Sequence, residues 1–181
     1  MYVRTSATLA FAVATFASLS GAGAASGVTW SMTAAGCTPA PATIDASKYA
    51  HVTIDGGVGF DAGAISTSPP AGPIVLICPI TNAPVGNQLT MVYRDSSGAA
   101  STASVKAELI AIPLIGPPPR TVVATINSDT FNLTGTSSLA ACIGTLDFDT
   151  NFYHVRVEIA RTAGNLTTRL YGLYIDTTIC T

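Results

Sequence analysis

Charge is scarce in this chain, and its scarcity argues against two classes of partner. Lys, Arg, Asp and Glu together make up 10% of the 181 residues. Such a sequence offers no basic stripe for nucleic acid and no polybasic cluster for an anionic membrane surface. With a mean hydropathy of +0.46, the composition favours large β-sheets whose outer surfaces carry Thr, Ser and Ala. We therefore expect no nucleic-acid partner.

Motifs of hydrolases and metal sites are missing as well. The sequence has two histidines, His51 and His154, and neither a G-x-S-x-G elbow nor a C-x-x-C pair. Both histidines fall in strand-like segments among polar or small neighbours, which is typical of surface positions. Glu108 and Glu158 lie beside Lys or Arg on polar strand faces, so we interpret them as ion-pair partners and not as a glycosidase pair. A Ser-His-Asp site can be assembled from any order along a chain, and a secreted hydrolase is therefore kept as the third alternative.

Aromatic side chains that could form a sugar-binding platform are few. Trp30 is the single tryptophan and lies near the start of the expected mature chain. Tyr153 lies on an apolar strand face, which predicts a core position. Tyr171 and Tyr174 are three positions apart, so we expect them to point to opposite faces of a sheet, with at most one exposed with its own sheet face. The sequence shows no repeated ladder of aromatic residues.

No hydrophobic run is long enough to span a bilayer. The longest, residues 7–19, has about 13 apolar or small residues, against about 20 for a membrane-spanning helix. It follows a positive charge at Arg4 and precedes the small-residue site Ala22-Gly23-Ala24, which is the arrangement of a secretory signal peptide. The sequence thus predicts a signal peptide over 1–24. The mature chain, 25–181, is expected to be secreted, held at the cell surface or periplasmic, without a membrane span.

All four cysteines fall in the predicted mature chain. An even number of cysteines in an exported protein favours two disulfides over a zinc site. Three pairings are open, and we prefer Cys37–Cys78 with Cys142–Cys180, because each closes a moderate loop and the two halves stay independent. Loops of about 40 residues would each contribute up to about 4 kcal/mol in the chain-entropy model.

Turn signals recur every eight to twelve residues and separate short segments rich in β-formers. The clearest strand pattern is in 152–160, where apolar and polar residues alternate without exception. Strands at this spacing predict one all-β domain, a single antiparallel β-sandwich that is jelly-roll-like and has about eight strands. The segments predicted as strands are 49–54, 74–78, 88–93, 104–112, 121–126, 152–160 and 167–175.

One stretch, LDFDTNFYHVRVEIAR, has the spacing of calcium ligands. Asp147, Asp149 and Asn151 fall at positions 1, 3 and 5 of a calcium loop. Glu158 falls at position 12, but Phe152 stands where the loop requires Gly. A strand pattern also carries Glu158 roughly 23 Å away from Asn151. We interpret the loop as an Asx-type turn between two strands, and a calcium site completed by residues from elsewhere is the alternative left open.

Several short motifs occur together in this chain. They are Cys37-Thr38-Pro39, the Gly-rich strand GGVGF, VLICP ending at Pro79 and Tyr93-Arg94-Asp95 at a strand end, followed by LDFDTNFYHVRVEIAR and LYGLYI. In this combination the mature chain resembles a recurrent group of small secreted bacterial proteins of uncharacterised function. In that group the first two cysteines recur together and the last two need not, which implies a Cys37–Cys78 pair. The group does not require Asp at 149, which argues against calcium. The resemblance implies a fold and an exported location, and no mechanism.

These features favour a secreted, non-catalytic β-sandwich that acts as a structural or interaction protein, with a surface, matrix or glycan partner. An extracellular carbohydrate-binding module is the second hypothesis. We expect no catalytic residue and no cofactor. The site residues proposed from sequence are the disulfide cysteines Cys37, Cys78, Cys142 and Cys180 and the calcium candidates Asp147, Asp149 and Asn151.

Overall fold

The structure of the protein is a computed structural model. It describes residues 27–40, 51–52, 56–60, 73–116, 119–162, 166–178 and 180. The predicted signal peptide, 1–24, lies outside the described residues, and its cleavage stays a prediction.

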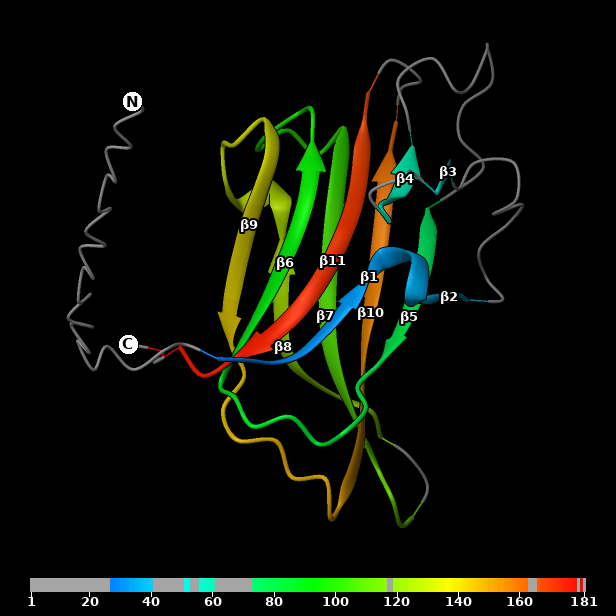
Figure 1. The fold of residues 1–181 in the computed structure, drawn as a ribbon. Coiled ribbons are helices and arrows are strands. Elements are labelled where there is room, and N and C mark those ends of the chain that lie inside the picture. The colour runs from blue at the N-terminus through cyan, green and yellow to red at the C-terminus, as the bar shows by residue number, and fades with distance from the viewer. Residues whose placement is uncertain are drawn as a thin grey trace, which may run out of the picture.

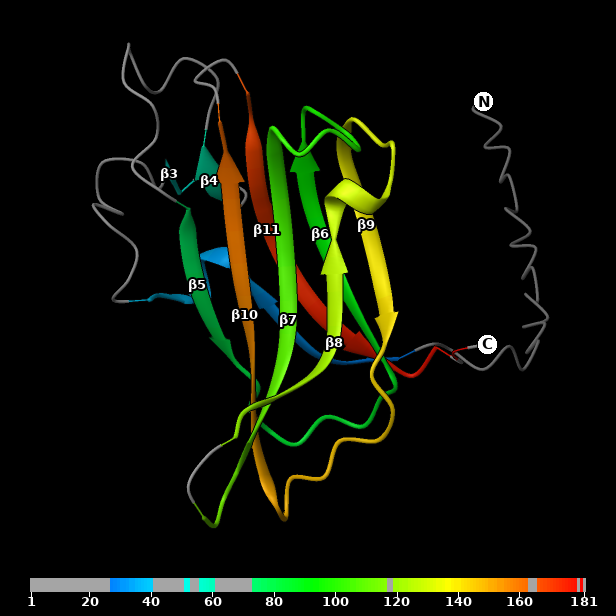
Figure 2. The ribbon, with the colours of Figure 1, turned by 180° about the vertical axis from the view of Figure 1, so that it is seen from behind.

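The described residues form two antiparallel β-sheets that face each other as a sandwich (Figures 1 and 2). One sheet has the order β3-β4-β11-β6-β9, with β1 paired to β11 beside this path, and the other has the order β2-β5-β10-β7-β8. The elements are β1 (Val28–Thr33), the 3-10 helix η1 (Ala34–Gly36), β2 (Thr38–Pro39), β3 (His51–Val52), β4 (Val58–Phe60), β5 (Ile74–Pro79), β6 (Gln88–Asp95), β7 (Ala103–Pro113), β8 (Thr121–Asn127), the 3-10 helix η2 (Ser128–Thr130), β9 (Gly135–Cys142), β10 (Asn151–Arg161) and β11 (Thr168–Asp176).

Strands β4 to β11 give the fold its topology. Their orders, β4-β11-β6-β9 in one sheet and β5-β10-β7-β8 in the other, are those of a jelly roll, in which the chain crosses repeatedly between the sheets. This confirms the predicted antiparallel sandwich. Strands β1, β2 and β3 are additional, so the described residues hold eleven strands where about eight were expected.

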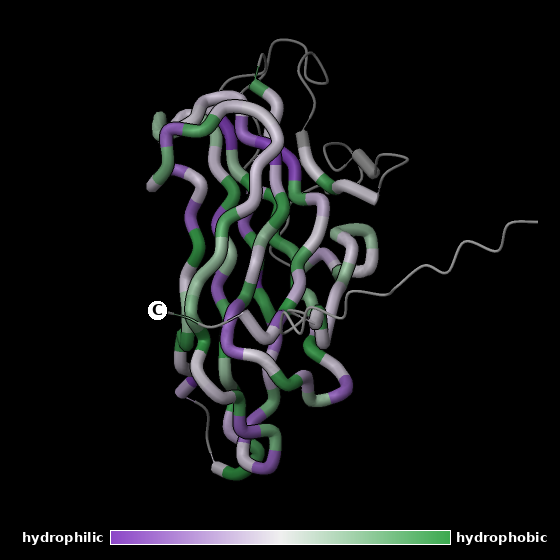
Figure 3. Tube along the Cα trace, turned by 60° about the vertical axis from the view of Figure 1, so that its left-hand side comes forward, coloured by the Kyte–Doolittle hydropathy of each residue, from purple (hydrophilic) through white to green (hydrophobic). Residues whose placement is uncertain are grey.

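The core lies between the two sheets and follows from alternation along the strands. In β10, Tyr153, Val155, Val157 and Ile159 are buried, as the sequence predicts. β7 pairs with β10 in continuous register over 11 residue pairs and repeats the pattern. Figure 3 shows the same alternation as green segments between white and purple ones along the strands. Burial of each such side chain contributes about 1.5–3 kcal/mol.

A bulge in β11 overturns one expectation about two tyrosines. The register between β11 and β6 shifts between Leu170 and Gly172. Leu170 and Leu173 are both buried although they are three positions apart. The extra residue, Tyr171, interrupts the alternation. The prediction that Tyr171 and Tyr174 lie on opposite faces rested on unbroken alternation and therefore no longer holds; both are half-buried.

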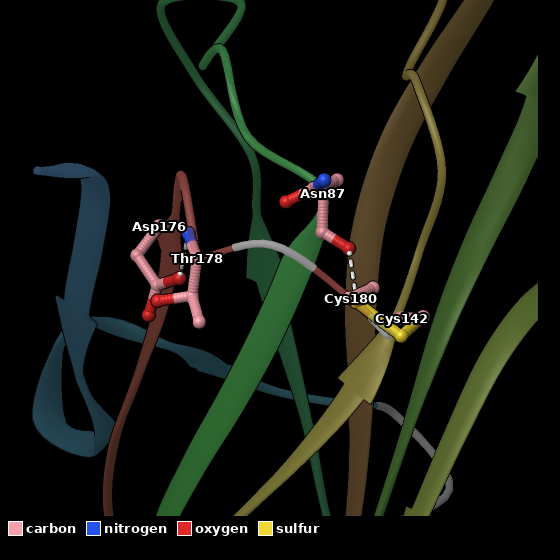
Figure 4. The surroundings of a disulfide bond; sticks show 5 residues. All are labelled: Asn87, Cys142, Asp176, Thr178 and Cys180. Carbon is pink, nitrogen blue, oxygen red and sulfur yellow. Dashed lines mark hydrogen bonds between the residues drawn. A yellow bond between two sulfur atoms is a disulfide. The ribbon is translucent and has the colours of Figure 1, made fainter. Parts of the chain in front are cut away.

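The disulfides join the pairs that were preferred from the sequence. Cys37–Cys78 is buried and links the segment after η1 to β5, with a sequence separation of 41. Cys142–Cys180 ties the last residue of β9 to the C-terminal segment after β11, with a separation of 38 (Figure 4). The dashed line between Cys180 and Asn87 marks a sulfur–oxygen contact of 3.2 Å, because a disulfide sulfur has no hydrogen to donate. Two disulfides are typical of proteins from oxidising compartments.

A buried polar network closes the upper end of the sandwich, where η2 and the β6–β7 connection lie (Figure 1). The Asp95 carboxylate is fully buried and accepts hydrogen bonds from the backbone N–H of Ser97 (2.8 Å) and from its hydroxyl (2.9 Å). It also accepts one from the Ser128 hydroxyl at 2.7 Å. Ser128 Oγ in turn accepts from the backbone N–H of Val105 at 2.9 Å. The network therefore joins the two sheets through β6, β7 and η2.

Asp129, next to this network, is expected to limit stability at neutral pH. Its Oδ1 is buried without a hydrogen-bond partner among the described residues. Burial, and then the nearby Asp95 carboxylate, raise the pKa of Asp129. A raised acid pKa means that the folded state binds the proton more tightly than the unfolded state. Stability is therefore lost as pH rises from the unfolded-state value, about 3.9, through the folded-state pKa.

Asp129→Asn, which cannot ionise, should thus raise the free energy of unfolding near pH 7 by about 0.5 kcal/mol, since solvent screens a partly exposed carboxylate. Thermal melts at several pH values would measure this gain, which should vanish below pH of about 3.5. Asp149→Asn, at an exposed carboxylate, is the matched control and should leave the melts unchanged. An Asp129→Asn variant that is less stable than the parent at pH 7 would contradict this account.

Candidate functional site

A cavity of about 490 Å³ lies at the lower end of the sandwich. It lies between two loops, one joining β5 to β6 and the other joining β9 to β10 (Figures 1 and 2). The first loop contributes 83–87, the second contributes 145–149, and Thr177 completes the lining. Loops at the end of a rigid sandwich are common positions for binding residues.

The β5–β6 loop is held against the end of β11 by close backbone packing. A Cβ atom on Gly86 would lie 2.5 Å from the Asp176 carbonyl oxygen and 2.6 Å from Ile175 Cγ2, so glycine is required there. Asn82 and Ala83, just before, both adopt the left-handed region, with φ of 66° and 42°. Left-handed conformations of non-glycine residues cost free energy and occur frequently at functional sites. The loop thus forms a fixed, strained wall of the cavity.

The opposite wall holds two of the candidate calcium residues, Asp147 and Asp149, and the hydrogen bonds of this loop are those of an Asx turn. Asp147 Oδ1 accepts from the backbone N–H of Asp149 at 3.0 Å, and Oδ2 accepts from the Thr150 hydroxyl at 2.7 Å. These hydrogen bonds, first that of Thr150, lower the pKa of Asp147. The Asn151 amide donates to Thr150 Oγ1 at 2.8 Å. The loop therefore has the Asx-turn conformation that its sequence predicts.

The fourth residue of the calcium pattern lies on another surface. Glu158 lies along β10, where it pairs in register with Val75 and Lys106 and bonds Arg156 at 2.9 Å. The strand therefore carries Glu158 away from the loop, as its alternating pattern indicated. Among the described residues, no group of three or more His, Cys, Asp or Glu side chains could hold a metal ion.

Calcium is accordingly expected to leave folding stability unchanged. A site with a millimolar dissociation constant would add about 1.4 kcal/mol at ten times that concentration. Melts of the oxidised protein in chelator and in about 10 mM calcium, at matched ionic strength, measure this term. A rise of several degrees that Asp149→Ala abolishes would show that the loop binds the ion.

Chemically, the cavity combines carboxylates, an amide and an aromatic ring. Asp147 and Asp149 line one side. Phe148 lies between them in sequence and packs on Tyr153, with ring centroids 4.8 Å apart and an interplanar angle of 60°. Asn87 lies on the facing side, and its Oδ1 is buried without a partner among the described residues. No basic residue occurs among the described lining residues, so the cavity suits a hydroxyl-rich or cationic ligand better than an anion.

A second surface lies on the outer face of the five-stranded sheet, and its upper part is charged. Arg156 bonds Glu108 at 3.4 Å across β10 and β7 and Glu158 at 2.9 Å along β10. Lys106 pairs with Glu108 at 2.6 Å. Lys106 and then Arg156 supply the interactions that lower the pKa of Glu108. Both glutamates are therefore the ion-pair partners that the sequence predicts.

The lower part of the same face is apolar and continues onto the β7–β8 hairpin. We call Ile112, Leu114, Ile115, Val122 and Phe152 the lower apolar surface. Phe152 is 65% exposed and pairs with Ile112, while Val122 is 50% exposed. Leu114 and Ile115, on the hairpin, are 41% and 92% exposed. Figure 3 shows green segments at this end of the molecule. Exposed apolar residues gathered in one place mark interaction sites more often than scattered ones do.

His154 lies next to the lower apolar surface and lacks the environment of a catalytic base. It pairs in register with Pro79 and Ile110. Burial, and then the positive charge of Arg120, lower the pKa of its imidazole. A catalytic histidine is instead oriented by a carboxylate, which raises its basicity. The side chain of His51 is not described.

Sequence reasoning found the Asp147 turn and missed the rest of this end. The opposite wall of the cavity follows from packing of the β5–β6 loop on β11, which no sequence pattern specifies. The lower apolar surface did have a signal: Ile110 and Ile112 replace the polar residues that Lys106 and Glu108 supply earlier on the same face of β7.

None of the described helices is long and apolar enough to cross a membrane. No protein-family model and no curated protein matches the chain. Among solved structures, that of a family two carbohydrate esterase from Cellvibrio japonicus is similar over 82% of this chain, with 12% identity and a TM-score of 0.42. The match spans 33% of that chain. At this level the likeness carries no argument about function.

Proposed function

We propose that the protein is an exported, non-catalytic interaction module that binds a protein partner through its lower apolar surface. The observation that carries this proposal is the clustering of exposed apolar side chains at one end of the sandwich, with Ile115 at 92% and Phe152 at 65% exposure. Withdrawing such side chains from water contributes about 25 cal/mol per Å².

The surroundings of this surface support binding over catalysis. The glutamates on the same face are neutralised by Arg156 and Lys106. His154 has a cation as its charged neighbour. Two disulfides and a continuous jelly roll hold the surface on a rigid frame, which reduces the ordering cost of binding. The resemblance to small secreted bacterial proteins supports the exported location in this proposal.

Site-specific photo-crosslinking tests the proposal. A photoreactive phenylalanine at Ile115 should give a discrete crosslinked product when the oxidised protein is added to the surface and extracellular fraction of its own cells. The same group at Ser31, an exposed position on β1, is the control and should not give that product. Phe152→Ser should weaken the crosslink at least tenfold, a loss of about 1.4 kcal/mol. Identical products at both positions, or none, would refute the proposal.

The cavity supports a second candidate, a carbohydrate-binding module. The side-chain oxygens of Asp147 and Asp149 and the Asn87 amide could bond neighbouring sugar hydroxyls, and Phe148 supplies an apolar surface beside them. A glycan array with purified protein tests this directly. Selective binding that Asp149→Asn removes and Phe152→Ser leaves intact would assign the function to the cavity. Binding lost only in Phe152→Ser would assign it to the lower apolar surface.

A further inference from the structure

The edges of the two sheets differ in how they are protected from pairing with another strand. An exposed edge is a template for a further strand, and proteins usually block it by shortness, proline, charge or a bulge. Here β2 and β3 have two residues each, and β2 ends in Pro39. β1 and β8 each carry a register irregularity, at Thr29 and at Val123. Four of the described edge strands are therefore blocked by one of these devices.

Strand β9 is the exception. It pairs with β6 over eight residue pairs in continuous register and has no described strand on its other side. Its sequence, GTSSLAAC, contains no charged residue and no proline. Thr136, Ser138 and Ala140, on the outer face of the sheet, are all exposed. In Figure 1 β9 lies at the left-hand limit of the described strands, and in Figure 2 it lies at the right-hand limit, so both views place it at the margin of the sandwich.

The lower end of β9 is also fixed in place. Cys142 is the last residue of the strand and is tied to Cys180. A strand that is already paired with β6 along its length and tied at one end loses little conformational entropy when it pairs again. The roughly half of its backbone N–H and C=O groups that point away from β6 are thus presented in a fixed geometry.

We propose that β9 pairs with β9 of a second copy of this chain, so that two sandwiches form a closed, two-fold dimer. The occupant must be an extended strand, because the edge offers a row of backbone donors and acceptors. A two-fold axis across β9 places the strand antiparallel to itself, which is the pairing direction found throughout both sheets.

Self-pairing meets no electrostatic obstacle in the strands involved. β9 is uncharged, so no like charges oppose each other along it. The neighbouring edge strand, β8, is preceded by Arg120 and followed by Asp129 in η2. A two-fold axis places the lower end of an edge in one copy beside the upper end of the same edge in the other copy. Arg120 at the start of β8 in one copy would therefore lie toward Asp129, after the end of β8, in the other. The contact uses the same edge on both copies, and the other described edges are blocked, so assembly stops at two chains.

Sedimentation equilibrium of the oxidised, mature protein between about 1 and 200 μM tests the dimer. The parent should approach the mass of two chains. Replacing Ser138 and Ala140 with lysine puts charges on the edge at exposed positions and should raise the dimer dissociation constant at least tenfold. Replacing Ser31 and Thr33 with lysine adds the same charges, two positions apart, to the bulged strand β1 and should change the constant by less than about twofold.

Hydrogen exchange of the parent provides a test that needs no variant. Peptides covering 135–142 should exchange more slowly at about 200 μM than at about 2 μM, while peptides covering β1 exchange equally at both concentrations. A monomer over the whole range would overturn the proposal. So would a dimer that is weakened equally by both pairs of substitutions, or concentration-dependent protection that excludes β9. The dimer does not depend on the function proposed above, because crosslinking at Ile115 to a different protein reports on another surface.

Discussion

Replacing Cys37 and Cys78 with alanine is expected to lower the free energy of unfolding by about 5 kcal/mol, more than replacing Cys142 and Cys180. The two loops have nearly equal sequence separations, 41 and 38. The chain-entropy contribution is therefore about 4 kcal/mol for each. Cys37 and Cys78 are buried in the core, whereas Cys142 is exposed. Loss of two buried sulfur atoms adds a transfer and cavity cost of about 1–2 kcal/mol that the second pair does not incur.

Urea unfolding of the two double alanine variants measures this difference directly. Because chain entropy is matched, the gap between the variants isolates the packing contribution of the buried pair. Equal m-values in the two variants are the control that both unfold from the same compact state to unfolded chains of similar expansion. Equal losses would mean that the core closes around the missing sulfur atoms. A larger loss for the pair at Cys142 would show that anchoring of β9 matters more than core packing.

Alternation along strands made most of this fold predictable. Where one face of a strand is buried, as in β10 and β7, hydrophobic residues recur at every second position and mark both the strand and its core face. β9 was not predicted as a strand, because its sequence lacks this alternation. Its sequence is small and polar, and Leu139 is its single large buried side chain. An edge strand is specified by its neighbour β6 and by the disulfide at its end, and neither is visible in eight local residues.

The candidate site likewise has a part that local sequence predicts and a part that depends on contacts between distant segments. The Asx turn at Asp147 depends on residues within four positions of each other, so local sequence was sufficient. The cavity requires 83–87 and 145–149 to face each other, and this depends on jelly-roll topology and on Gly86 packing against β11. The bulge at Tyr171 belongs to the same class, because it exists through pairing between β11 and its neighbours. Features that arise from contacts between distant segments leave no periodic signal.

Asp95→Ala is expected to destabilise the protein by about 3–5 kcal/mol, although Asp95 is far in sequence from every disulfide. The carboxylate accepts three hydrogen bonds, from the Ser97 backbone and hydroxyl and from the Ser128 hydroxyl. Alanine removes the acceptor of the buried Ser128 hydroxyl and of the Ser97 backbone N–H, at about 1–3 kcal/mol each. The Ser97 hydroxyl still has the carbonyl oxygens of Ala100 and Ala103 within reach, at 2.8 and 2.9 Å. Part of this loss of stability is offset, because removing the Asp95 charge also removes its repulsion of the Asp129 carboxylate, which is one cause of the raised pKa of Asp129.

A double-mutant cycle with Ser128→Ala distinguishes a coupled network from separate hydrogen bonds. Ser128 Oγ also accepts from Val105 in β7, so losing either partner disturbs the link between the sheets. We expect the sum of the two single-variant losses to exceed the loss in the double variant, with a coupling energy of about 1–3 kcal/mol. Asp149→Ala removes an exposed carboxylate and should change stability by less than about 0.5 kcal/mol. Additive losses within about 0.5 kcal/mol would show that Asp95 stabilises the β6–β7 turn locally, and that η2 is held in place by other contacts.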